Sequence, residues 1–510
     1  MATRTGRLPY GIGQFTTGLS VLIVILLAIF GWGIYAYSRQ YVEGLVVTGL
    51  RDIGTMGGAA WGLYIAFDIY FVGVSFAGIT MAALIRLLHL EHLKPVSRMA
   101  ELLTVVSLIL AAFSVLPDLG QPVRGIVNLF RYARPQSPFF GTFTLVVSGY
   151  LIASLVYLYL DGRRDAALLA QVKGPLQGFY RLWAAGYRDT PAERERHDRA
   201  SFWLAIAIVP LLVTAHSTLG FVFGIQSGRP GWFSALQAPG FVVMAGVSGI
   251  GLLIVIAAIL RNVLNEQEQL HEGIFRWLGA FLMVLILVYL YFMVVELLTT
   301  TYAGHHHEVR LTLALVTGGY AWLFWGVVAS LLLAFVSLLL PHLPELLRVR
   351  VPAFQPAYAW ATGVTALVVA AFLILQRTAP PGEAFLMLSP GVLRWTPLLL
   401  GALAVLFLVS LFPLFSRNVV ASAAVSGLLV NLAAIGKRLL IVVPSQTHGT
   451  LLPYGTGTYT PTWVEYSIIG GLFALGTLLY LVFVKVFPIM EVHTTGEEVA
   501  DADDAHCAHG

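Results

Sequence analysis

Residues 61–86 read WGLYIAFDIYFVGVSFAGITMAALIR. This stretch is apolar and long enough to cross the hydrocarbon core of a bilayer as one helix. Asp68, near its middle, is costly in lipid, so its carboxyl is expected to face protein or a water-filled cavity, as a proton or ligand position does. The alternative is a neutral Asp68 that only hydrogen-bonds a neighbouring helix. Because the small residues at 73–78 (GVSFAG) allow another helix to approach closely, the stretch is predicted to form an inner wall of a helix bundle.

A similar run of small residues, GVSGIG, returns at positions 246–251. The chain between the two runs is long enough for four helices and their loops. A four-helix unit that occurs twice in the same orientation explains this spacing, as in other membrane proteins with parallel internal repeats.

The composition excludes an ordinary soluble domain. Hydrophobic residues make up 58% of the chain and charged residues 11%, whereas soluble domains carry roughly 25% charged residues. The chain is therefore a polytopic membrane protein. Its one cysteine, Cys507, excludes a disulfide framework and any iron–sulfur cluster or c-type haem held by this chain alone. The net charge of +4 is small and the basic residues flank the apolar runs, so nucleic-acid binding is not indicated.

Apolar runs of suitable length predict twelve membrane spans. They lie near residues 17–38, 59–86, 99–117, 139–160, 201–224, 237–260, 273–298, 318–341, 357–376, 393–415, 418–443 and 462–487. Most Lys and Arg residues fall on the side that holds the N-terminus, so the positive-inside rule places both termini in the cytoplasm. The only sizeable cytoplasmic loop, 161–200, mixes basic and aromatic residues and is expected to lie on the membrane surface as an amphipathic helix. The tail 491–510 is acidic and is expected to be disordered.

With this orientation, polar and aromatic residues gather near the periplasmic ends of the spans. They include Trp61, Tyr64, Asp118, Arg124, His216, Glu296, Lys437, Arg438, Tyr459 and Glu465. Aromatic walls, one or two titratable groups and an opening to lipid are what a site for an amphiphilic ring with a long tail requires. Asp68, about two helical turns below Trp61, is suited to accept a proton from a hydroxyl group of such a ring.

Histidines are possible haem ligands, since a b-type haem needs axial ligands on facing helices. His216 is the only histidine well inside a span, so two bis-histidine pairs cannot be assembled and a cytochrome b is not indicated. His216 serves either helix packing or proton traffic. The run 305–308 (HHHE) lacks the spacing of a preformed metal site and is expected to be a solvated loop or lid, so no metal site is predicted.

Several motifs resemble the NrfD/polysulfide-reductase membrane-subunit family, which also includes subunits of the alternative complex III and hydrogenase anchors. They are Trp61-Gly62-Leu63-Tyr64, the run 73–78, Asp118-Leu119-Gly120-Gln121-Pro122, Tyr302-Ala303-Gly304 with residues 320–325 (YAWLFW), and residues 459–466 (YTPTWVEY). The resemblance runs from about Trp61 to Pro488. Two departures stand out: Phe76 occupies a position where some quinol-oxidising relatives have a histidine, and Gln121 occupies one where the family usually has an arginine.

The resemblance implies a quinone-interacting subunit of a multisubunit oxidoreductase in the bacterial cytoplasmic membrane. Such subunits carry no haem or iron–sulfur cluster and no catalytic metal. They bind a quinone, menaquinone or ubiquinone, near the periplasmic face. They exchange electrons with a ferredoxin-like iron–sulfur subunit, which serves a molybdopterin or cytochrome subunit. Translocation of protons across the membrane can accompany this exchange.

The predicted fold is an all-α polytopic membrane protein of ten to twelve spans, with two tandem four-helix bundles plus flanking helices. The segments are an N-terminal helix and connection (1–58), a first bundle (59–224), a second bundle (237–443), a final helix (462–487) and the tail 491–510. The family architecture accounts for ten spans. The surplus hairpin, about 357–415, interrupts the second bundle and has no functional explanation.

The residues predicted to bind quinone or to handle its protons are Trp61, Tyr64, Asp68, Asp118, Arg124, His216 and Glu296. Asp118 and Arg124 flank a Gly-Gln-Pro turn and are expected to shape the head-group site or the edge that meets the partner subunit. The alternative is a salt bridge between them that only clamps the loop. Two other functions compete with the quinone-interacting role: a secondary transporter, which suits twelve spans and an internal repeat, and a purely structural membrane anchor.

Overall fold

The computed structural model describes residues 9, 11–50, 59–132, 134, 136, 144–348, 353–378, 402–403, 406–407, 410–447 and 459–492. Every regular element among these residues is a helix, which confirms the predicted all-α class. In chain order the elements are α1 (Thr17–Glu43), η1 (Leu45–Val47), α2 (Leu63–Val74), α3 (Phe76–Arg86), η2 (Glu91–Leu93), α4 (Lys94–Asp118), α5 (Pro122–Tyr132), α6 (Thr144–Leu169), α7 (Gln177–Ala184), α8 (Pro191–Gly224), α9 (Gln237–Val263), α10 (Glu272–Ala303), α11 (His306–Val316), α12 (Ala321–Leu339), α13 (Leu343–Leu347), α14 (Pro356–Thr378), α16 (Val419–Val442), α17 (Pro444–Thr447) and α18 (Trp463–Val486).

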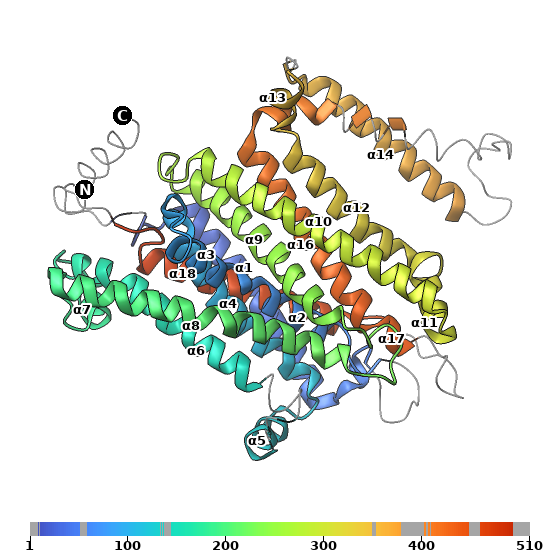
Figure 1. The fold of residues 1–510 in the computed structure, drawn as a ribbon, viewed down its shortest axis with the longest axis horizontal. Coiled ribbons are helices and arrows are strands. Elements are labelled where there is room, and N and C mark those ends of the chain that lie inside the picture. Colours follow the sequence, from blue (N-terminus) through green and yellow to red (C-terminus); the bar gives the residue numbers. More distant parts are fainter. Residues whose placement is uncertain are drawn as a thin grey trace.

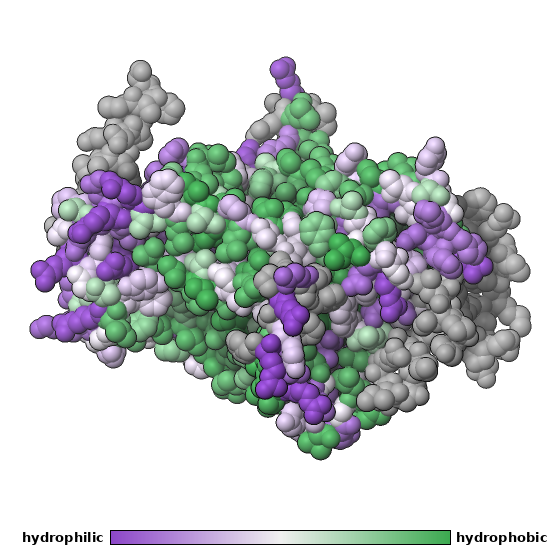
Figure 2. Space-filling model, turned by 60° about the horizontal axis from the view of Figure 1, so that its bottom comes forward, coloured by the Kyte–Doolittle hydropathy of each residue, from purple (hydrophilic) through white to green (hydrophobic). Residues whose placement is uncertain are grey.

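Ten stretches in the described part of the chain are long and apolar enough to cross a membrane, which makes this a polytopic membrane protein. They correspond to ten of the twelve predicted spans. The ninth predicted span is α14, whose apolar part is shorter, at Pro356–Ala371. Most of the tenth, 393–415, lies outside the described residues, as does the tail beyond residue 492. Figure 2 shows a flank dominated by hydrophobic side chains, with hydrophilic side chains gathered at its left end, where α7 lies.

The spanning helices run alternately in opposite directions, so the protein has two ends (Figure 1). We call them the Asp118 end, where α1, α4, α8, α10 and α16 finish, and the Arg98 end, where these helices begin. The first and last described segments meet at the Arg98 end, because the Gly13 N–H donates to the Lys485 carbonyl at 3.0 Å.

The helices pack in two groups of four. In the first group, the continuous pair α2–α3 contacts α4 and α8, and α6 contacts α4 and α8. In the second group, α9, α10, α12 and α16 contact one another. Helices α1 and α18 pair along their length and lie against α4.

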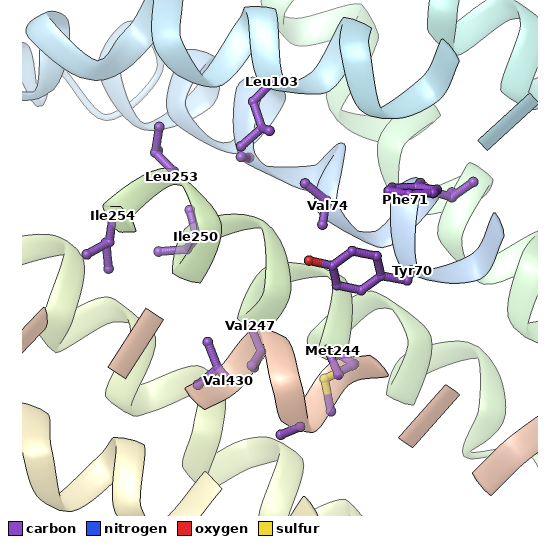
Figure 3. Close-up of a cluster of buried hydrophobic side chains, with 14 of the residues drawn as sticks. Tyr70, Phe71, Val74, Leu103, Met244, Val247, Ile250, Leu253, Ile254 and Val430 are labelled. Atoms are coloured by element: carbon purple, nitrogen blue, oxygen red, sulfur yellow. The ribbon is translucent and has the colours of Figure 1, made fainter. Parts of the chain in front are cut away.

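The two runs of small residues meet at the boundary between the groups, where α2–α3 crosses α9. A Cβ atom added at Gly249 would lie 2.9 Å from the Val74 carbonyl oxygen, and one at Gly73 would lie 3.3 Å from Ser248 Oγ. Only residues without larger side chains allow this approach. Figure 3 shows the apolar packing beside it, with Tyr70 and Val74 of α2 facing Met244 and Val247 of α9. The repeated motif therefore joins the two groups.

The predicted span 59–86 corresponds to one membrane-crossing stretch, Leu63–Arg86, which a local break at Ser75 divides into α2 and α3. The Ser75 hydroxyl donates back to the Val72 carbonyl at 2.6 Å. Two other hydroxyls, from Thr104 and Tyr150, donate to the Ser75 carbonyl at 2.7 and 2.6 Å. These side-chain bonds satisfy the backbone at the break, which apolar surroundings require.

The predicted loop 161–200 is shorter in the structure, because α6 continues to Leu169 and α8 begins at Pro191. A capping box starts α8: Thr190 Oγ1 accepts from the Glu193 N–H, and the Glu193 carboxylate accepts from the Thr190 N–H. The expected amphipathic helix is α7. Its Trp183 ring stacks on Phe487 after α18, with 4.8 Å between ring centroids, so α7 contacts the C-terminal segment.

A buried arginine ties the Arg98 end together. Arg98, 1% exposed, donates to the Asp161 carboxylate at 2.9 Å and to the Asp165 carboxylate at 2.6 Å. It also donates to the carbonyls of Pro488 and Met490 at 3.0 and 3.2 Å. This one side chain therefore links α4, α6 and the segment that follows α18.

Candidate functional site

Three carboxyls lie at the Asp118 end of the first group: Asp68 on α2, Asp118 on α4 and Glu465 on α18. We call them the carboxyl cluster. An electrostatic interaction links Asp68 to Asp118, and another links Asp118 to Glu465.

Asp68 and Asp118 are not locked in hydrogen bonds. Asp68 is 5% exposed, and no hydrogen bond joins it to another residue in the described ranges. The Oδ1 atom of Asp118 is buried and lacks a hydrogen-bond partner in the same part of the chain. Buried polar atoms are almost always paired in native proteins. The two carboxyls therefore present free hydrogen-bonding capacity to a water molecule or a ligand.

A hydrogen-bonded chain of side chains runs beside these carboxyls. The Tyr64 hydroxyl, fully buried, donates to Gln40 Oε1 at 2.6 Å. The Gln40 amide donates to the carbonyl of Pro117, the residue before Asp118, at 2.6 Å. Tyr64 is thereby held between α1 and α4, with the charges of Asp118 and Glu465 acting on it.

Glu465 has a structural role that Asp68 and Asp118 lack. Its carboxylate accepts from the Gly49 and Thr462 N–H groups at 2.7 and 3.0 Å and from the Tyr459 hydroxyl at 2.5 Å. The same Tyr459 hydroxyl accepts from the Leu63 N–H at 2.7 Å. Burial and the Glu465 carboxylate raise the pKa of Tyr459, so its hydroxyl stays protonated and keeps donating. This pair fixes the start of α2.

Trp61, before the start of α2, forms an aromatic wall towards the second group. Its ring stacks on Trp232 with 5.7 Å between centroids and meets the edge of Phe223 at the same distance. Its backbone N–H donates to Gln446, and the Gln446 amide donates to its carbonyl, at 3.1 and 2.9 Å. Trp61 therefore joins the first group to α17.

The chain matches the model of the family described as "Polysulphide reductase, NrfD" over residues 52–380. The chain belongs to this family. A putative membrane subunit of a dimethyl sulfoxide reductase from Halobacterium salinarum is 27% identical over 486 residues, or 94% of each chain. A selenate reductase subunit of Mesobacillus selenatarsenatis is 27% identical over 76% of this chain and 92% of its own length. An Hdr-like menaquinol oxidoreductase integral membrane subunit of Archaeoglobus fulgidus is 26% identical over 60% of this chain and 66% of its own.

In this NrfD-family chain, only Asp68 and Asp118 of the seven predicted site residues belong to the carboxyl cluster. Arg124 is exposed on α5, and no ion pair between it and Asp118 is found in the described residues, so the alternative of a salt bridge that clamps the loop is not supported. His216 is buried in α8, with Nδ1 2.8 Å from the Leu212 carbonyl and Nε2 2.9 Å from the Val72 carbonyl. Since a neutral imidazole has one N–H, it satisfies one of these carbonyls, and only the protonated ring satisfies both.

Glu296 belongs to a separate site in the second group. Its Oε2 atom lies 3.2 Å from Lys437 Nζ, and both side chains line a pocket at the Asp118 end between α10, α11 and α16. The run 305–308, expected to be a solvated loop or lid, is instead the start of helix α11, where Glu308 accepts from the Gly231 N–H at 2.8 Å. Within the described ranges no cluster of three His, Cys, Asp or Glu side chains is arranged to hold a metal.

A further buried acid, Glu101, lies at the other end of this NrfD-family protein. Glu101, 4% exposed, lies at the Arg98 end of α4 in a small pocket with Thr104, Ser154 and Tyr157. Its Oε1 accepts from Ser97 at 3.0 Å. The atoms Glu101 Oε2 and Ser154 Oγ are buried without a hydrogen-bond partner in the described chain. Buried water molecules typically bind such unsatisfied polar atoms.

Proposed function

We propose that this chain is the subunit through which a multisubunit oxidoreductase exchanges electrons with the membrane quinone pool. The carboxyl cluster carries the proposal, because oxidation of a quinol releases two protons with its two electrons and needs nearby acceptors. Asp68 and Asp118 are buried acids with unused hydrogen-bonding capacity at one end of the membrane. Tyr64 and Trp61 supply aromatic surface at the same end.

The comparisons support the quinone as substrate and leave its type to experiment. One relative is named as a menaquinol oxidoreductase subunit, so we propose menaquinone ahead of ubiquinone. The other two relatives are named as subunits of dimethyl sulfoxide and selenate reductases. We accordingly propose a ferredoxin-like iron–sulfur subunit as the electron partner, with a molybdopterin or cytochrome subunit beyond it.

We also propose a route for protons across the first group. Glu101 marks one end of this route and Asp68 the other. Between them lie Thr104 and Tyr150, both bonded to the Ser75 carbonyl, and His216, bonded to the carbonyl one turn beyond Asp68. We propose that water molecules hydrogen-bonded to these groups pass protons between the two ends while quinol is oxidised or formed, since a backbone carbonyl that accepts from two hydroxyls does not itself carry a proton.

The Arg98 end is proposed to face the cytoplasm of a bacterial cell, with both termini and α7. The positive-inside rule supports this orientation. A Gln171→Cys variant, made in a Cys507→Ser background, places one thiol in the exposed segment before α7. A membrane-impermeant thiol reagent is expected to label it only after the cells are opened, and labelling in intact cells would reverse the orientation.

A secondary transporter is less consistent with the structure. Such proteins commonly have broken helices in corresponding positions of both repeats. Here α2–α3 breaks at Ser75, but its counterpart α9 is unbroken from Gln237 to Val263.

The proposed function is tested by quinone-linked turnover of the purified complex. The complete complex is expected either to reduce its electron acceptor with a short-chain quinol or to reduce a short-chain quinone with its electron donor. The partner subunits without this chain are expected to lose that activity. The partners should keep activity with an artificial soluble donor. Equal quinol turnover with and without this chain would leave it as a structural anchor only.

A further inference from the structure

The second group has its own pocket at the Asp118 end, apart from the carboxyl cluster. Helices α10, α11, α12, α16 and α17 form its walls. The cluster residues come instead from α2, α4 and α18. Met293, Leu311 and Phe324 give the pocket an apolar lining, while its polar groups come from Glu296, Glu308, Lys437 and Ser445.

One polar group in this pocket is unused. The Ser445 hydroxyl is buried, lines the pocket and has no hydrogen-bond partner in the described part of the chain. An unpaired buried hydroxyl costs free energy that a bound partner would recover. Ser445 therefore marks a place where a ligand oxygen or a water molecule is expected.

A second hydrogen-bond donor without a partner in the described residues, the Arg438 guanidinium, lies on α16 next to Lys437. Arg438, 2% exposed, stacks on Phe241 with its guanidinium carbon 4.2 Å from the ring centroid. Its Nη1 atom is buried and forms no hydrogen bond within the described residues. Phe241 lines an adjoining pocket that shares Glu296 and Lys437 with the first.

The charges around the pocket favour a neutral ligand. Lys437 is paired with Glu296 at 3.2 Å, and Glu308 lies on the opposite wall, bonded to the Gly231 N–H. Burial raises the pKa of Glu308, which suits this carboxyl to exchange a proton with a ligand hydroxyl. An anionic phosphate would meet two carboxyls, whereas a ring with carbonyl or hydroxyl oxygens can accept from Ser445 and Lys437 and donate to Glu308.

An exposed apolar surface adjoins the pocket. Leu297 lines the pocket, and its neighbour on α10, Leu298, is 63% exposed on the outside of the helix. A polyisoprenoid tail attached to a ring in the pocket can therefore leave between apolar side chains into the bilayer.

We propose that this pocket binds the head group of a second quinone molecule, separate from the one at the carboxyl cluster. The inference rests on the proposed function, because it assigns the same class of substrate. The two sites share a wall: Gln446, next to Ser445, bonds the Trp61 backbone, and Trp61 stacks on Trp232, next to Gly231. The stacked rings of Trp61 and Trp232 therefore separate the two proposed quinone sites.

Photoaffinity labelling of the purified complex with an azido-quinone tests the proposal. Labelled peptides are expected from both groups of helices: near Tyr64 or Asp118 in the first, and within 293–300 or 437–447 in the second. Ser445→Ala is expected to lower labelling of the second set about tenfold, while labelling of the first set stays unchanged. The matched control Ser426→Ala, a buried serine on α16 that bonds the Ala334 carbonyl, is expected to change neither.

Labelling confined to the first group of helices would overturn the second site and leave the proposed function intact. Labelling of residues 437–447 that is unaffected by Ser445→Ala and by Lys437→Gln would also overturn it. Absence of labelling anywhere, in a complex that is otherwise assembled, would overturn the proposed function itself.

Discussion

Asp68→Asn is expected to lower quinol-linked turnover on the order of 100-fold, in line with the loss of a general acid or base. Asn keeps the size and the hydrogen-bonding shape of the side chain but cannot hold or release a proton. Because no hydrogen bond ties Asp68 to another described residue, the exchange breaks no such contact and the complex should assemble normally. Turnover measured over a range of pH, with the amount of assembled complex as control, checks this result.

Glu101→Gln tests whether protons cross the membrane through this chain, independently of the uptake of quinol protons at the carboxyl cluster. Glu101 lies at the Arg98 end, in the small pocket with Ser154. The variant is expected to leave quinol binding unchanged and to lower the number of protons moved across the membrane per quinol in proteoliposomes. If Asp68→Asn and Glu101→Gln both leave rate and proton movement unchanged, these acids only hold helices together.

Arg98→Ala is expected to destabilise the protein by about 3–5 kcal/mol, the cost of leaving buried charges without their partner. The side chains of Asp161 and Asp165 are only 5% and 4% exposed, and both lose their ion pair. The segment after α18 loses two hydrogen bonds as well. A lower unfolding temperature in detergent and a lower level of assembled protein in the membrane measure the effect.

Lys94→Ala is the matched control for Arg98→Ala. Lys94, on the same helix, pairs with Glu91 at 2.9 Å, and both side chains are largely exposed. Loss of such a surface pair costs roughly 0–1 kcal/mol. Equal effects of the two substitutions would show that burial of the Arg98 ion pairs contributes nothing to stability.

The membrane fold was predictable because apolar length and small-residue spacing are local signals. The ten spans that the structure describes correspond to apolar runs, and the runs at 73–78 and 246–251 indicated close packing. Which helices they join was not predictable, since the contact between Gly249 and Val74 depends on tertiary structure. The capping-box residues Thr190 and Glu193 indicate in the sequence where α8 starts, but this segment was predicted to be part of the loop 161–200.

The candidate site was only partly predictable. Asp68 and Asp118 stand out because carboxyls are rare in apolar runs, and in the structure an electrostatic interaction links the two. Gln40 was missed because the apolar run of α1 stops near residue 38, whereas the helix continues to Glu43 through polar residues. His216 bonds a backbone carbonyl on α2, and no side-chain pattern signals such a contact.

Redox-induced infrared difference spectroscopy of the purified complex tests most directly whether quinone protons reach the carboxyl cluster. Oxidation of bound quinol is expected to produce a carboxylic-acid carbonyl band, as an acid of the cluster takes up a proton, and Asp68→Asn is expected to remove that band. Two results would contradict the assignment of Asp68 as the proton acceptor, provided that quinol is still oxidised. One is the same carboxylic-acid band in the wild-type protein and in Asp68→Asn, and the other is the absence of the band from both.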